Sequence, residues 1–175
     1  AEAAIFVLSR YGTEATDLKF SGGSATDYSH GNYLELSPTE IDVLTNLKAL
    51  KDQGKVSKII VLLNSVNQVE CDYINDPAYG IDAVLWVGIG GTSGTLGIGR
   101  ILSGEVSPSG KLTDTWAKRY SDIPFADEYS YLNGYLDDEF YREGIYVGYR
   151  YFDSFGVEPA YPFGFGLSYT SFSIQ

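Results

Sequence analysis

The sequence predicts an α/β fold, a mostly parallel sheet sandwiched by helices, with an irregular Tyr-rich arm and a C-terminal tail. Apolar runs of strand length alternate with helix-like stretches over the first 116 residues. Such alternation is typical of a parallel sheet with right-handed crossovers. From residue 120 to 141 the chain becomes irregular and rich in Tyr and Asp. We expect an α/β sandwich core over residues 1–119, and an arm and C-terminal segment over 120–175 that pack on or complete the same domain.

The first strand and the helix after it have clear local signals. Residues 5–8, IFVL, form a short continuous apolar run, which predicts a strand buried on both faces. Ser37 can cap a helix, Pro38 suits its first turn, and Glu40 completes a capping box. An amphipathic stripe follows, and Gly54 is expected to end the helix.

Later elements follow from composition. Residues 58–65 and 82–90 are apolar runs that predict two further strands. Residues 91–104 have helix-compatible apolar spacing, which their glycines weaken. Residues 111–116 are a candidate strand, and parts of residues 145–175 alternate as a strand does.

Composition limits the class of protein. The 175 residues include 44% hydrophobic residues, enough for one globular domain with its own core. The chain begins with Ala and holds no Met, so we interpret it as a fragment or processed chain, and its ends give no localisation. No apolar run is long enough to span a membrane. The net charge of −11 argues against nucleic acid as a partner.

Metal and cofactor sites are not expected. One cysteine, Cys71, excludes an internal disulfide framework and a multi-thiolate zinc site, and a single histidine, His30, excludes a histidine-rich site. The glycine run after residue 87 lacks the dinucleotide-binding register, because Ser93 stands where a glycine is needed. A phosphate loop fails at Leu112, which occupies the position of the magnesium-binding Ser or Thr.

The chemistry that remains is that of carboxylates. Glu14 lies just beyond the first predicted strand, and ligands of open parallel sheets bind outside the carboxyl ends of the strands. Asp17, Asp27 and His30 share the polar, glycine-rich segment that follows, and Glu35 lies shortly after it. Glu14 is our catalytic candidate, and Asp17 and His30 are weaker substrate-binding candidates.

Four stretches together carry a resemblance. KIIVLLNS, DAVLWVGIGG, ILSGEVSPSGKL and YVGYRYFDSFGVEPAYPFGFGLSYTSF occur in this order. They resemble the second, α/β sandwich domain of glycoside hydrolase family 3, and the PSGKL turn and the PFGFGLSYT ending are the most specific pieces. After the first strand, Gly12 and Thr13 stand where that family usually has Ser-Gly before its acid/base glutamate.

The resemblance implies a fragment of a retaining β-glycosidase, a β-glucosidase acting on β-glucosides or short oligosaccharides. It implies that Glu14 is the acid/base, that the nucleophile lies on an absent (β/α)8 barrel domain of the same enzyme, and that the chain alone is inactive. The alternative is a non-catalytic carbohydrate-binding or interaction module, in which the 15 tyrosines provide the platform.

Overall fold

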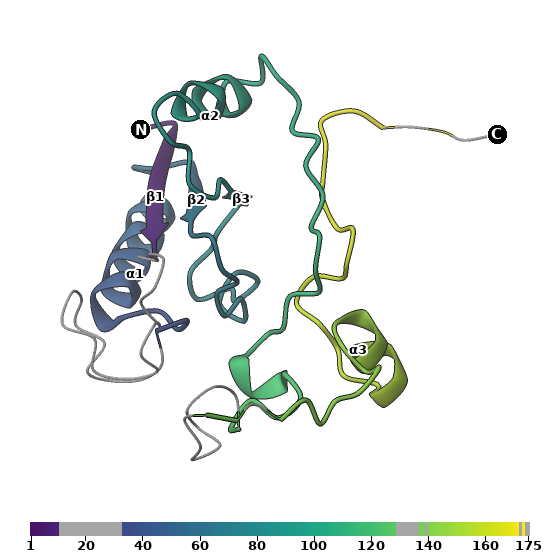
Figure 1. The fold of residues 1–175 in the computed structure, drawn as a ribbon. Coiled ribbons are helices and arrows are strands. Elements are labelled where there is room, and N and C mark those ends of the chain that lie inside the picture. Colours follow the sequence, from purple (N-terminus) through teal and green to yellow (C-terminus); the bar gives the residue numbers. More distant parts are fainter. Residues whose placement is uncertain (11–32, 129–136, 139, 172, 174–175) are drawn as a thin grey trace. The chain divides into compact units, whose positions relative to one another are not determined.

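The computed structural model describes residues 1–10, 33–128, 137–138, 140–171 and 173. Its elements, shown in Figure 1, are β1 (Ala3–Ser9), α1 (Pro38–Asp52), β2 (Lys58–Asn64), β3 (Ala83–Trp86), α2 (Thr95–Leu102), the short 3-10 helix η1 (Tyr120–Asp122) and α3 (Tyr149–Phe155). The chain divides into two compact units, Ala1–Gly99 and Arg100–Gln175. In the described ranges, no helix is both long and apolar enough to cross a membrane.

The first unit contains a three-stranded sheet in the order β1-β2-β3, with both strand pairs parallel. Ile5 pairs with Ile60, and Ile60 pairs in turn with Ala83, so the three strands are aligned in register. Helix α1 connects β1 to β2 and packs on both strands (Figure 1). The predicted α/β fold with a parallel sheet is confirmed.

One face of the sheet forms the core with α1. Side chains of Leu8, Val61 and Leu63 share that face by register and are buried, as is Leu44 of α1. The opposite face of β1 is open: the side chains of Ile5 and Val7 are 52% and 51% exposed. Burial of β1 on both faces was therefore a wrong expectation for this chain. The reason is that, among the described elements, α1 is the helix that packs on this strand.

Helix α1 begins as the sequence predicts. The Ser37 hydroxyl accepts a hydrogen bond from the backbone N–H of Glu40 at 3.2 Å, and the Glu40 carboxylate accepts one from the backbone N–H of Ser37 at 2.8 Å. The helix ends at Asp52, with Gln53 as its C-cap and Gly54 next at φ 71°. This capping box satisfies two backbone donors that the first helical turn would otherwise leave unpaired.

Strand β2 matches its predicted range closely, and β3 is shorter than predicted. β3 stops at Trp86 because the backbone of Gly88, just beyond it, has a φ of 58°, which a strand does not allow. Before β3, the Asp82 carboxylate accepts hydrogen bonds from Lys51 Nζ and from the backbone N–H of Ile59, both at 2.7 Å. Burial opposes ionisation of Asp82, but these hydrogen bonds and the charges of Lys51 and Lys58 lower its pKa below the usual value. Asp82 thus ties the amino-terminal edge of the sheet together.

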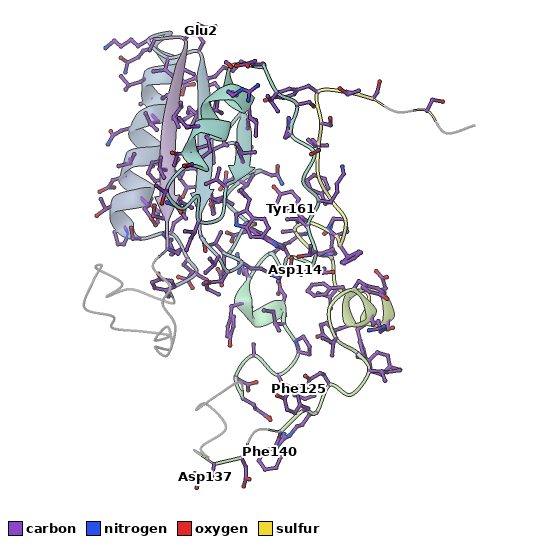
Figure 2. All side chains as sticks on the ribbon, turned by 45° about the horizontal axis from the view of Figure 1, so that its top comes forward. Glu2, Asp114, Phe125, Asp137, Phe140 and Tyr161 are labelled. Atoms are coloured by element: carbon purple, nitrogen blue, oxygen red, sulfur yellow. The ribbon has the colours of Figure 1, made fainter. Side chains whose placement is uncertain are left out.

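In the second unit, two segments far apart in sequence run side by side: residues 107–116 and residues 160–169. The backbone N–H of Leu112 donates to Phe165 O, and that of Gly164 donates to Leu112 O, both at 2.8 Å. Figure 2 labels Asp114 and Tyr161 at neighbouring places on these segments. The PSGKL turn and the PFGFG run, which sequence analysis had singled out separately, are therefore partners.

Two local predictions in this unit were wrong. Residues 111–116 form no regular strand: Leu112 and Trp116 form backbone hydrogen bonds with residues 160–165, but these are not continuous and give one isolated antiparallel bridge, between Trp116 and Tyr161. Within the alternating C-terminal stretch, Tyr149–Phe155 is the helix α3, which buries Phe152. Gly156 ends this helix in the left-handed conformation, at φ 66° and ψ 28°.

Candidate active site

The carboxyl ends of the three strands meet at one edge of the sheet, because all three strands are parallel. The backbone N–H of Arg10, just after β1, donates to Asn64 O at the end of β2 at 3.0 Å. The backbone N–H of Val87, just after β3, donates to Leu63 O at 2.9 Å. This is the edge at which open parallel sheets bind ligands.

The site residues predicted from sequence belong to the segment that leaves this edge. Glu14, Asp17, Asp27 and His30 all lie in residues 11–32, outside the described residues. Their assignment therefore stays a prediction. Glu35 is described, and its backbone carbonyl lies at hydrogen-bond distance from the Arg10 guanidinium, so the structure does bring it to the end of β1.

The side chain of Arg10 is extensively hydrogen-bonded at this edge. It is 4% exposed, and its guanidinium donates to the carbonyl oxygens of Ser9, Tyr33 and Glu35 at 3.0, 2.8 and 2.6 Å. It also forms a two-pronged ion pair with the Glu40 carboxylate, at 2.7 and 2.9 Å. These five bonds use all five N–H groups of a guanidinium. The buried positive charge is thus fully paired.

Glu40 has two roles in this arrangement. The oxygen Oε2 accepts both the backbone N–H of Ser37, as part of the capping box, and Nη2 of Arg10. The ring of Tyr33 adds a cation–π contact, with its centroid 5.9 Å from the Arg10 guanidinium carbon. Arg10 and the start of α1 therefore form one connected polar network.

The ends of β2 and β3 contribute a serine and a tryptophan. Ser65 is fully buried, and its hydroxyl donates to Asn67 O at 2.7 Å. The indole N–H of Trp86 donates to Ser65 O at 2.7 Å, while the side chain stays 38% exposed. Trp86 is therefore held by its polar edge and keeps part of its ring accessible.

Burial determines the state of the Cys71 thiol, and close backbone packing explains Gly94 in the glycine run. Burial, with help from the charges of Asp72 and Glu70, raises the pKa of Cys71 to about 12, so its thiol stays protonated near neutral pH. Gly94 has a packing role: its N–H donates to Gly90 O at 2.8 Å, and a Cβ there would lie 2.9 Å from Gly90 Cα. In the described ranges, no three His, Cys, Asp or Glu side chains gather where they could hold a metal ion.

Sequence reasoning missed Arg10. It identified Glu40 only as part of the capping box, since that pairing is local, whereas Arg10 reaches Glu40 across 30 positions. One signal was present: an arginine directly after an apolar strand must find several acceptors if the strand end is buried.

Comparison with known proteins agrees with this fold. Residues 1–149 match the family described as the glycosyl hydrolase family 3 C-terminal domain. A β-glucosidase from Ruminococcus albus is 43% identical over 126 residues, which are 71% of this chain and 13% of that protein. Beta-glucosidase A from Butyrivibrio fibrisolvens is 35% identical over 192 aligned residues, which cover the whole chain and 22% of that protein.

Among solved structures, beta-glucosidase 3B from Thermotoga neapolitana in complex with glucose aligns with a TM-score of 0.80 and 37% identity. The alignment covers 97% of this chain and 22% of that one. The chain thus spans about one fifth or less of the length of these relatives. The fold, its sheet edge and the match over residues 1–149 lead to one conclusion: the chain belongs to the glycosyl hydrolase family 3 C-terminal domain family.

Proposed function

We propose that this chain is the second domain of a retaining β-glucosidase, and that Glu14 is the acid/base of the reaction. The observation that carries the proposal is position: Glu14 follows Arg10 by four residues, and Arg10 lies at the carboxyl edge of the sheet. The β-glucosidase relatives support the substrate class, terminal β-D-glucosides or short oligosaccharides.

The chemistry assigned to Glu14 has two steps. First, its carboxyl proton moves to the glycosidic oxygen while the bond from that oxygen to C1 breaks and a carboxylate nucleophile bonds to C1. The alcohol leaves, and Glu14 is now ionised. Second, Glu14 takes a proton from water while the water oxygen bonds to C1 and the nucleophile departs as carboxylate. Glu14 is then protonated again and the cycle closes.

The nucleophile belongs to another part of the parent protein. Retaining hydrolysis needs two carboxyl groups about 5 Å apart, and the chain is only a fraction of the length of its β-glucosidase relatives. We therefore place the nucleophile on a (β/α)8 barrel domain that adjoins this one. Asp17 and His30 receive no chemical step; we expect them to be solvated or to face the leaving group.

The test uses the full-length parent protein with Glu14→Ala. Phenyl β-glucoside has a poor leaving group that needs protonation, and 2,4-dinitrophenyl β-glucoside has one that does not. We expect kcat/KM to fall by about 10²- to 10⁴-fold for the phenyl substrate and far less for the dinitrophenyl substrate. Azide should restore turnover by attacking C1 without a base, and β-glucosyl azide is the expected product.

Two further variants make the result specific. Glu2→Ala removes an exposed carboxylate at the opposite end of β1 and should leave both substrates unaffected. Asp17→Ala tests the neighbouring carboxylate. We call a much larger fall in kcat/KM for the phenyl substrate than for the dinitrophenyl substrate a leaving-group split. A split in Asp17→Ala and none in Glu14→Ala would assign the acid to Asp17. If neither variant affects turnover while the chain binds sugar, the non-catalytic carbohydrate-binding module is the correct function.

A further inference from the structure

We infer that Arg10 is a positioning residue for the acid/base: it fixes both ends of the segment that carries Glu14. The inference rests on the function proposed for Glu14. Its evidence lies in described residues only, namely Arg10, its carbonyl partners and Glu40.

The bonds of Arg10 join two separate parts of the chain. On one side are Ser9, the last residue of β1, and the Arg10 backbone, which is bonded to β2. On the other side are the carbonyls of Tyr33 and Glu35, where the chain returns towards α1. Residues 11–32 run between these two places. One side chain therefore holds the exit and the return of this segment together.

The anchor also limits where Glu14 can be. Four residues separate Glu14 from Arg10, and four extended residues span at most about 14 Å. A shift of the anchor therefore shifts the region that the Glu14 carboxyl group can reach. A misplacement of about 1 Å of a catalytic group costs about 10²-fold in rate.

Only arginine can make this set of bonds. Its planar guanidinium offers five donors in a fixed geometry, whereas a lysine ammonium offers three around one point. Because Arg10 is 4% exposed, a carbonyl left without its partner has little access to bulk solvent. An Arg10→Lys variant keeps the charge and loses at least two of the five bonds.

The start of α1 does not by itself require Arg10. The capping box between Ser37 and Glu40 already satisfies the helix end. Two of the five bonds instead go to carbonyls that precede the helix, at Tyr33 and Glu35. A structural ion pair of the same unit, Lys51 with Asp82, lies at the opposite edge of the sheet and provides a matched control.

The experiment compares Arg10→Lys, Glu40→Gln and Asp82→Asn in the full-length parent protein, at a temperature where thermal unfolding shows each variant to be folded. For Arg10→Lys, we expect kcat/KM for phenyl β-glucoside to fall by about 10²-fold and that for the dinitrophenyl substrate to stay within a few-fold. Glu40→Gln should give the same split in smaller measure. Asp82→Asn should give no split.

Each outcome has a distinct meaning. Suppose that Arg10→Lys lowers kcat/KM equally for both substrates while Glu14→Ala still shows the leaving-group split. Arg10 is then only structural and the inference fails, but the function proposed for Glu14 stands. If Glu14→Ala itself shows no split, the proposed function fails and the inference falls with it. If Arg10→Lys does not fold, Glu40→Gln decides. A leaving-group split in Glu40→Gln supports a positioning role for Arg10, and an equal loss of kcat/KM for both substrates refutes it.

Discussion

Cys71 shows how strongly burial controls a single side chain. The thiol is 2% exposed and donates to Val69 O at 3.1 Å. Two carboxylates flank it in sequence, Glu70 and Asp72, and both disfavour a thiolate. Both of these charges can be read from the sequence. The larger cause, burial, became visible only in the fold.

We predict that Cys71 resists alkylation in the native chain. Its pKa rises from 9.0 to about 12, which lowers the thiolate fraction at pH 8 by about 10³-fold. Iodoacetamide should modify the folded chain at least about 100-fold more slowly than the urea-unfolded chain. The same shift means that, between pH 9 and 12, the unfolded state loses this proton first, so the contribution of Cys71 to stability falls as pH rises through that range. Equal rates of modification in both states would contradict the assignment.

Glu40 marks the limit of prediction at the residue scale. The spacing from Ser37 to Glu40 was enough to predict the capping box, because both partners lie within one helical turn. The second partner of Glu40, Arg10, lies 30 positions away and becomes a neighbour only after β1 and α1 pack. Local spacing cannot contain such information.

At the scale of elements, the glycine-rich turn before α2 is a packing feature. Gly90 and Gly94 approach so closely that a Cβ on Gly94 would overlap the carbonyl of Gly90. Gly97, inside α2, has open space around it. Of two glycines in the same run, Gly94 therefore has no room for a methyl group and Gly97 has.

We predict that Gly94→Ala destabilises the 175-residue chain by about 1–3 kcal/mol, while Gly97→Ala stabilises it by about 0.5–1 kcal/mol through helix propensity. Urea unfolding followed by tryptophan fluorescence measures both, with Trp86 and Trp116 as probes. Identical midpoints for the two variants would show that the backbone approach at Gly94 has no energetic role.

The elements predicted wrongly were those whose residues suit more than one structure. Tyr149–Phe155 is rich in aromatic residues, which favour strands, yet it forms a helix because Gly156 can end one and Phe152 has a place to be buried. Residues 111–116 look like a strand, but their hydrogen bonds to residues 160–165 are too few and too scattered to form a regular one. β1, α1, β2 and β3, which have strong and continuous patterns, were predicted correctly in kind and place.

At the scale of the whole molecule, the fold class and the family were accessible from sequence, and the geometry of the site was not. The alternation of strands and helices and the motifs at residues 107–112 and 162–170 pointed to the family that the comparisons show. The Arg10 network joins residues 9, 33, 35 and 40, whose proximity depends on the packing of α1 against the sheet.

We predict that the 175-residue chain alone does not hydrolyse aryl β-glucosides. The physical reason is that one carboxyl group can protonate a leaving group but cannot also form the glycosyl intermediate. Release of 4-nitrophenol from its β-glucoside should match the buffer blank. Turnover above the blank that disappears in Glu14→Ala would mean that the chain holds a complete site.

The order of the strands also affects how the first unit folds. β3 joins β2 across 23 positions, from Ile60 to Ala83, whereas β1 joins β2 across 55 positions, from Ala3 to Lys58. Loop-closure entropy makes the longer connection more costly by about 0.8 kcal/mol. The backbone N–H of Arg10 bonds to Asn64 O where this longer loop closes. Its side chain bonds to residues 33, 35 and 40 inside the same connection, so one residue offsets part of the entropy lost at the junction that is the harder of the two to assemble.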